Sequence, residues 1–163
     1  MSNNRPMSLR FTVTFVLSIA CLVASACANY KAGLGAYERG DYATALREWR
    51  PLAEHGDAGA QVGLGVLYIN GQGVPQDYPK AVVLFRLAAD QGNAGAQVKL
   101  GAMYEEGKGV PQDLVLAHKW YNLASASGDT VSIQLRDNLA KHMTPTQIVE
   151  AQELAREWKP TLK

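Results

Sequence analysis

The feature that most constrains this chain is a segment of 36 residues that occurs twice in succession without a gap. Residues 58–93 and 94–129 are identical at 18 of 36 aligned positions. Both copies contain the string G-x-G-V-P-Q-D, at residues 71–77 and 107–113. A period of this length is typical of two-helix units that stack into a solenoid, because one such unit cannot bury its apolar face alone.

The glycines and the aspartate of the repeated string mark the ends of helices. Gly71 or Gly73 can supply the left-handed residue that ends a helix, and Pro75 keeps the residue before it extended. Asp77 is then placed to accept hydrogen bonds from the first N–H groups of the next helix. A phosphate-binding loop instead follows a strand and leads directly into a helix. The string therefore predicts a turn between two helices and not a nucleotide site.

Small residues inside the predicted helices indicate close packing. Gly65 and Gly101 each cost a helix about 1 kcal/mol relative to alanine, which is understandable where two backbones approach closely. The large apolar residues at repeated positions are expected to fill the core between the helices: Leu64, Tyr68, Phe85, Leu87, Leu100, Tyr104, Tyr121 and Leu123.

The two units together resemble Sel1-like repeats, which are close relatives of tetratricopeptide repeats. The resemblance rests on the pattern A-x-A-Q-x-x-L-G-x-x-Y-x-x-G-x-G-V-P-Q-D and the alanine-rich second helix, and it covers residues 58–129 strongly and 30–56 as a partial unit. It implies an all-α fold, an α/α solenoid of antiparallel helix pairs, that binds protein partners. Known bacterial relatives are often exported, and some regulate envelope signalling or contribute to host contact.

The expected organisation has five parts. They are a signal peptide over 1–28, an N-terminal partial repeat over 29–57, repeats over 58–93 and 94–129, and C-terminal capping helices over 130–163. Thr144 and Gln147 have the capping-box spacing with Pro145 between them, which predicts the start of a last helix. We expect this helix to cover the exposed end of the array, with dimerisation as the alternative. The body from 30 to 158 should contain about seven helices and no strands.

The N-terminal residues have the pattern of a secretory signal. Arg5 and Arg10 precede an uncharged run over 11–23 that is too short to cross a membrane as a helix. Small residues follow, and we expect cleavage after Ala28, which would give a periplasmic or secreted protein without a membrane span.

The alternative for this leader is a lipoprotein signal, in which Cys27 carries a lipid anchor that holds the protein on a membrane. The only other cysteine, Cys21, also lies in the leader. No disulfide is therefore expected in the mature chain, which must be stabilised by packing.

No pattern in the sequence indicates catalysis, a cofactor or a metal site. The formal net charge of +1 provides no electrostatic footprint for nucleic acid. The three histidines, His55, His118 and His142, form no H-E-x-x-H motif and have no cysteine nearby. His118 aligns with Val82 of the preceding unit, and we expect it at the surface or at the edge of a groove. The sequence thus predicts a protein that is not an enzyme.

A partner-binding stripe is expected on the first helix of each pair, because these helices line the concave face of solenoids of this type. Residues three or four apart share one face of a helix. The hypothesis places the following residues in the groove: Val62, Val66, Ile69, Val98, Ala102 and Glu105. The apolar stripe ends in an acid, so it predicts a protein or peptide partner with an apolar segment and a basic residue. The alternatives are that these residues only pack against the neighbouring helix, or that the partner binds around His118 and Lys119.

The sequence therefore predicts a non-catalytic scaffold or adaptor in the bacterial envelope, which binds a protein or peptide and could regulate envelope signalling. Two alternatives remain open. One is a cell-wall-associated accessory that binds glycan, and the other is a virulence or host-contact factor.

Overall fold

The computed structural model describes residues 29–126 and 128–161. The expected signal peptide over 1–28, with both cysteines and the cleavage site, lies outside the described residues.

The described chain is all helical and contains no strand, as the sequence predicts. Residues 29–38 are helical, and seven further helices follow: α2 (Tyr42–Glu54), α3 (Ala58–Asn70), α4 (Tyr78–Asp90), α5 (Ala94–Glu106), α6 (Leu114–Ser125), α7 (Thr130–Ala140) and α8 (Pro145–Glu157). The first unit, over 29–54, is thus a complete helix pair, which makes one helix more than the expected seven. It differs from the later units in its shorter loop.

The 36-residue register of the sequence extends beyond the two similar units. Helix α2 begins 36 residues before α4. The same offset separates the starts of α3 and α5, of α4 and α6, and of α5 and α7. The helix over 29–38, which ends 32 residues before the end of α3, and α8 leave the register. Consequently positions 36 residues apart from α2 to α7 can be compared directly, and they differ in their side chains.

The loop over 71–77 connects two helices as predicted. Gly71 adopts the left-handed conformation, with φ of 64°, and ends α3. The Asp77 carboxylate accepts a hydrogen bond from the backbone N–H of Lys80 at 2.9 Å and caps α4. The Gln76 side chain donates to the backbone oxygen of Ile69 at 2.6 Å, which satisfies one of the last carbonyls of α3. The second loop repeats these bonds at the corresponding residues.

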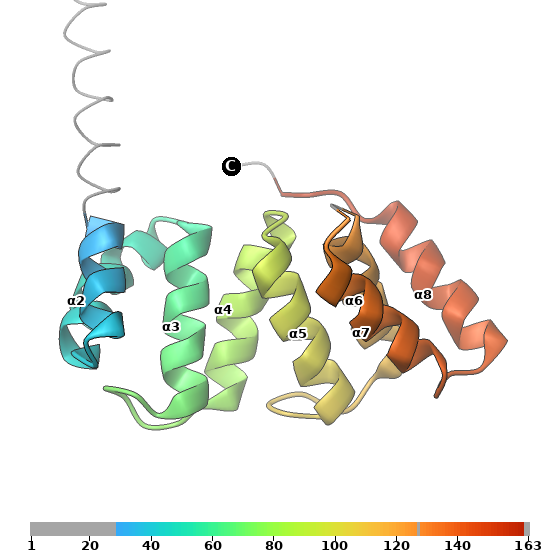
Figure 1. The fold of residues 1–163 in the computed structure, drawn as a ribbon, viewed down its shortest axis with the longest axis horizontal. Coiled ribbons are helices and arrows are strands. Elements are labelled where there is room, and N and C mark those ends of the chain that lie inside the picture. The colour runs from blue at the N-terminus through green and yellow to red at the C-terminus, as the bar shows by residue number, and fades with distance from the viewer. Residues whose placement is uncertain (1–28, 127, 162–163) are drawn as a thin grey trace, which may run out of the picture.

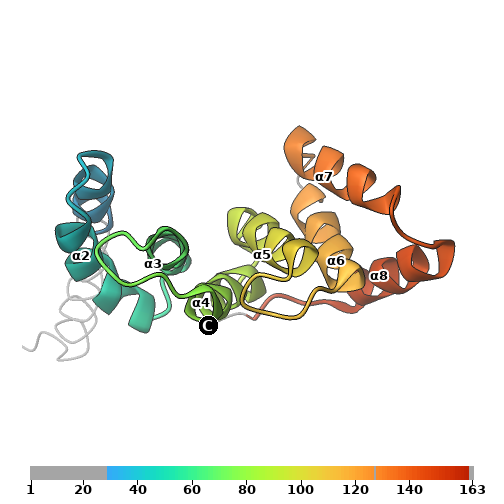
Figure 2. The same cartoon turned by 90° about the horizontal axis from the view of Figure 1, so that it is seen from below.

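The helices form two layers. Figure 1 shows them side by side along the long axis, and Figure 2 shows α3, α5 and α7 on one side and α4, α6 and α8 on the other. The first layer curves, because residues 29–38 and α7 rise on either side of α3 and α5. The first helix of each pair therefore lines the concave face.

The glycines inside α3 and α5 each receive the aromatic ring of the next helix. A Cβ added to Gly65 would stand 2.6 Å from the ring of Phe85, and one added to Gly101 would stand 2.7 Å from the ring of Tyr121. Both rings are buried. The close approach is mainly between helix backbone and ring, and not between two backbones as the sequence suggested.

Most of the expected core residues are buried, including Leu64, Phe85, Leu100, Tyr104 and Tyr121. Leu87 is an exception. It was expected in the core, but 44% of its surface is exposed on α4. The reason is that it lies on the outer face of the second layer, where the neighbouring helix α2 does not reach it.

Helix α8 packs against α6, on the flank opposite to α7 (Figure 2). Thr144 and Gln147 form the expected capping box at its start, with Pro145 at the first helical position. Ala151 and Ala155 are its buried residues. Within the described residues, no helix has the length and apolar character needed to cross a membrane.

The glycine–ring contact leads to a first prediction. Gly65→Ala should lower the free energy of unfolding by about 1–3 kcal/mol, because the methyl group overlaps a ring that has no room to move. This would reverse the gain of up to about 1 kcal/mol that alanine normally gives a helix. Chemical denaturation followed by circular dichroism measures the difference.

The matched control is Gly95→Ala in the first turn of α5. A Cβ at Gly95 would meet only the Asn93 side chain, at 3.4 Å. This variant should be as stable as the parent or more stable. If Gly65→Ala behaves in the same way, the ring contact does not set the helix spacing.

Candidate partner-binding site on the concave face

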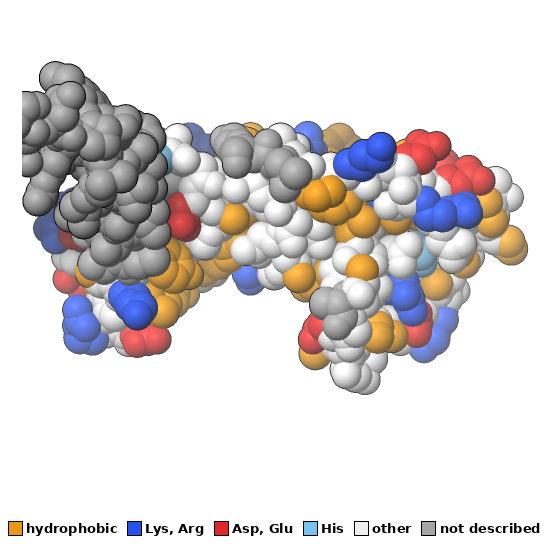
Figure 3. Space-filling view, turned by 90° about the horizontal axis from the view of Figure 1, so that it is seen from above, with side chains coloured by type: hydrophobic (Ala, Val, Ile, Leu, Met, Phe, Trp, Pro, Cys, Tyr) orange, Lys and Arg blue, Asp and Glu red, His pale blue; other side chains and the backbone are white. Residues whose placement is uncertain are grey.

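The concave face contains a groove with an apolar wall. In Figure 3 the molecule is visibly hollowed between its two ends. A groove of about 400 Å³ lies on the N-terminal side of this hollow. Its lining is mostly apolar and aromatic, with Asn93 and Lys99 as polar exceptions: Tyr30, Leu34, Tyr37, Trp49, Gly59, Val62, Gly63, Val66, Asn93 and Lys99.

A second, smaller hollow of about 190 Å³ continues toward α5 and the loops. Its lining includes Ile69, Tyr78, Ala102, Met103, Glu106 and Lys108, together with Lys99. Because Lys99 lines both hollows, its side chain stands where they meet. The two form one surface across α3 and α5, which we call the concave groove.

The structure brings four of the six predicted residues into the concave groove. Val62 and Val66 line its larger part, and Ile69 and Ala102 line its smaller part. Val98 is half-buried against the core and lines neither part.

Glu105, the sixth predicted residue, is engaged inside the protein. Its carboxylate accepts a hydrogen bond of 2.7 Å from the hydroxyl of Tyr121 on α6. Burial, and then this carboxylate, raise the pKa of Tyr121 above its ordinary value. Glu105 therefore supports the core contact of Tyr121, and a basic partner residue facing it would share this carboxylate with Tyr121. The expectation of such a basic residue stays a prediction.

The charge that the groove does present is Lys99. This side chain is exposed and makes no ion pair or hydrogen bond with any described residue. The neighbouring acid Glu106 is already paired with Lys108 at 2.6 Å. The predicted site did not include Lys99, which aligns with Gly63 of the preceding unit. The sequence feature that could have indicated this residue is the change from glycine at position 63 to a charged side chain at the corresponding position 99.

The aromatic wall was also missed. The ring centroids of Tyr30 and Tyr37 lie 6.2 Å and 5.8 Å from that of Trp49, whose indole N–H donates to the backbone oxygen of Tyr30. These residues belong to the first unit, which the sequence shows only as a partial repeat. Their clustering depends on the helix at 29–38 packing against α2, a contact that no repeat pattern predicts.

His118 is buried, and the expectation of a surface position is wrong. Only 2% of its surface is exposed, and its Nδ1 atom has no hydrogen-bond partner among residues 29–126 and 128–161. Burial, and then the charge of Arg136, lower its pKa. The alignment with Val82 was the informative signal, since Val82 is buried at the same position one unit earlier. His118 is therefore unsuited to contact a partner directly.

No metal site is apparent in this part of the molecule. Among residues 29–126 and 128–161, no three His, Cys, Asp or Glu side chains gather closely enough to hold a metal ion.

The fold defines an α/α solenoid, and the comparisons agree with it. The Sel1 repeat model matches residues 58–93 and 94–129. The chain is thus a Sel1-like repeat protein, and proteins with these repeats generally mediate protein–protein interactions. No curated protein matches it.

Two solved structures are similar. The first is a protective antigen of uropathogenic Escherichia coli strains that displays an SLR fold, with a TM-score of 0.78, 31% identity, and coverage of 82% of this chain and 29% of that one. The second is a Sel1 repeat protein from Oxalobacter formigenes, with a TM-score of 0.64, 26% identity, and coverage of 78% of this chain and 54% of the other. The chain therefore spans about a third of the first structure and about half of the second.

The burial of His118 predicts a loss of stability in mild acid. The pKa of His118 in the folded protein lies below its value of about 6.5 in an unfolded chain, so below pH 6.5 the unfolded chain binds a proton that the folded protein does not. Stability should therefore fall as the pH decreases from 7.5 to 5, and His118→Leu should reduce this dependence. Urea midpoints at several pH values measure it.

The exposed His142 provides the control. His142→Gln should keep the pH dependence of the parent. If His118→Leu also keeps it, the buried imidazole is not its source.

Proposed function

We propose that this protein is a non-catalytic interaction scaffold of the bacterial envelope, which binds an apolar segment of a protein or peptide in the concave groove. The observation that carries the proposal is the groove itself. It combines an apolar and aromatic wall with Lys99, a cation that has no ion-pair partner among the described residues, between its two parts. Regulation of envelope signalling is one role that such a scaffold could serve.

The chemistry of the groove favours a partner with an acidic residue beside its apolar segment. Lys99 makes no ion pair with the described residues, whereas Glu105 and Glu106 are engaged with Tyr121 and Lys108. A carboxylate near Lys99 would gain an attraction that no residue of the groove already satisfies. Two repeats offer a short groove, so an affinity of about micromolar strength is expected, equivalent to about −8 kcal/mol.

Glycan binding is the competing function, since aromatic residues beside polar groups can stack on sugar rings. The wall of this groove is less suited to it. Trp49 is only 3% exposed, and Tyr30 and Tyr37 are half-buried against it, so their ring faces pack within the protein. Host contact is a further alternative. It draws on the resemblance to the protective antigen from uropathogenic strains.

The envelope location is supported by the sequence of the leader. The leader has the three parts of a cleaved secretory signal: the basic residues Arg5 and Arg10, the uncharged run over 11–23, and small residues before Asn29. A lipid anchor at Cys27 is the competing arrangement.

Charge reversal in the groove tests the proposed site. Lys99→Glu and Val66→Glu should each weaken capture of a protein partner from envelope extracts at least about tenfold, or by about 1.4 kcal/mol. Lys99→Glu repels the acidic residue, and Val66→Glu places a charge on the apolar wall. Pull-downs with quantitative mass spectrometry measure the effect, and thermal melts identify any variant that is poorly folded.

The matched control is Val149→Glu, since Val149 is 51% exposed on α8, outside the groove. It should leave capture unchanged. Normal capture by both groove variants would remove the concave groove as the site. Retention of the parent protein on purified peptidoglycan, without a captured protein, would favour glycan binding instead.

The leader gives a separate prediction. Intact-mass analysis of the protein isolated from the envelope should give a chain that begins at Asn29. A mass that corresponds to a lipid-modified Cys27 at the N-terminus would contradict it and would place the scaffold on a membrane surface.

A further inference from the structure

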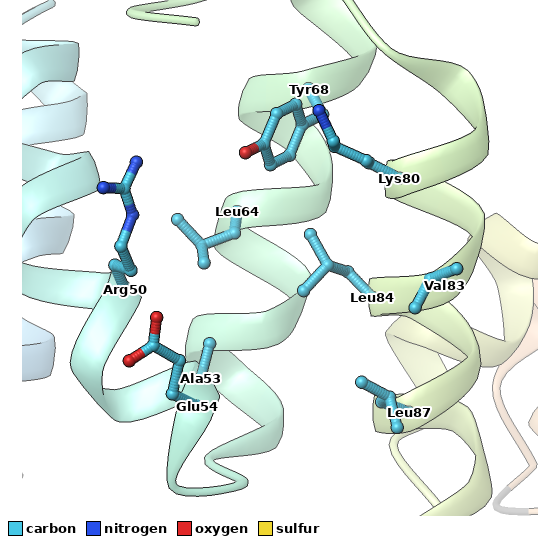
Figure 4. A pocket seen from close by; sticks show the side chains of 9 residues that line it. All are labelled: Arg50, Ala53, Glu54, Leu64, Tyr68, Lys80, Val83, Leu84 and Leu87. Carbon is cyan, nitrogen blue, oxygen red and sulfur yellow. The ribbon is translucent and has the colours of Figure 1, made fainter.

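A second groove lies on the opposite, convex face of the molecule, between α2 and α4, and we call it the α2–α4 groove. It has a volume of about 360 Å³. Figure 4 shows Arg50 and Glu54 on one side, Leu84 and Leu87 on the other, and Leu64 of α3 between them. Leu87 is 44% exposed there.

The equivalent groove one unit later, between α4 and α6, holds part of this same chain. After α8 the C-terminal segment over 158–161 turns back across the array toward the end of α4 (Figures 1 and 2). Trp158 packs edge-on against Trp120 of α6, with ring centroids 6.5 Å apart. Its indole also lies over Gly92, 3.9 Å from where a Cβ would stand.

A backbone hydrogen bond completes this contact. The N–H of Thr161 donates to the backbone oxygen of Asp90, at the end of α4, at 2.7 Å. The segment from Trp158 to Thr161 is therefore held by an aromatic anchor and, three residues later, by a main-chain bond. Its first residue, Trp158, has an extended backbone with φ of −66° and ψ of 138°, and no helix or strand is assigned to the segment.

The 36-residue register places equivalent groups in the α2–α4 groove or next to it. Leu84 corresponds to Trp120, Gly56 to Gly92, and Glu54 to Asp90. No described residue donates a hydrogen bond to the backbone oxygen of Glu54. The site that holds the tail in one unit is thus repeated in the preceding unit, where no described segment occupies it.

The charges of the two grooves differ. In the α4–α6 groove, Arg86 donates a hydrogen bond to the hydroxyl of Tyr104. The corresponding Arg50 makes no hydrogen bond or ion pair with any described residue, and Lys80, on the same groove, is paired with Asp77. With Lys80 neutralised by Asp77, Arg50 is the cation of this groove that has no ion-pair partner among the described residues, so an acidic residue of a ligand can complement it.

We propose that the α2–α4 groove binds an extended segment of a partner protein that carries a large aromatic side chain next to an acidic residue. The aromatic ring packs between Leu84 and Gly56, as Trp158 packs between Trp120 and Gly92. A backbone N–H three residues later donates to the oxygen of Glu54, and the acidic residue pairs with Arg50. The protein then has two independent docking surfaces, one on each face.

The chain's own tail supplies the probe. Two labelled peptides are compared with the purified full chain by fluorescence anisotropy: residues 155–161, and the same peptide with Lys159→Glu. The acidic peptide should bind with 1:1 stoichiometry and at least several-fold more tightly than the parent peptide. The same acidic peptide with Trp158→Ala should show no saturable binding, because it has lost its anchor.

Variants of the protein then locate the site. Leu87→Glu should weaken binding of the acidic peptide at least about tenfold, and Arg50→Glu should abolish the preference for it. Val149→Glu is again the matched exposed control and should bind normally. The concave-groove variants Val66→Glu and Lys99→Glu should also bind normally, so the outcome is independent of the function proposed above.

Three results would overturn the proposal. One is the absence of saturable binding by the acidic peptide to the parent chain. Another is binding that appears only when Trp158→Ala in the protein releases its own tail, which would confine the site to the α4–α6 groove. The third is a dimer in light scattering that Leu87→Glu dissociates, since a second copy would then be the occupant of the groove.

Discussion

The contact between a helix glycine and the aromatic ring of the next helix underlies the whole architecture. At Gly65 and Gly101 there is no space for a Cβ, because the rings of Phe85 and Tyr121 occupy it. Each ring is thereby buried between the two helices of a pair, and the pair acquires a fixed spacing. A fixed spacing within pairs is what allows successive units to stack in register.

Buried glutamines carry this register from one pair to the next. The side chain of Gln61 donates to the backbone oxygen of Ala53 on α2, and that of Gln97 donates to Ala89 on α4. Both glutamines are almost completely buried, so losing either bond would leave a polar group without a partner. The glutamine of the A-x-A-Q pattern therefore connects one helix pair to the preceding pair. The contact between the helix glycine and the aromatic ring holds the two helices of each pair together.

Two surfaces follow from this stacking. The curvature of the first layer produces the concave groove, and the α2–α4 groove lies between two helices of the second layer. What distinguishes one groove from another is its lining and its occupant. The chain fills the α4–α6 groove with its own Trp158, whereas Leu84 and Leu87 of the α2–α4 groove remain open to a partner. A repeat protein can in this way use the same kind of groove in one unit to hold its own C-terminal segment and in another unit to bind a partner.

The sequence by itself determined the all-α class, the repeat and the ends of its helices, because glycine, proline and aspartate act on neighbouring backbone groups and their effects are local. It also placed Val62, Val66, Ile69 and Ala102 on the concave face, since helical periodicity assigns residues to faces. Only the tertiary structure decided the state of Glu105, the burial of His118, and the return of the C-terminal segment to α4. These depend on contacts between different parts of the folded chain, namely with Tyr121 of the next helix, with α7 and with the end of α4. No local pattern records such distances, because they arise only when the units have packed together.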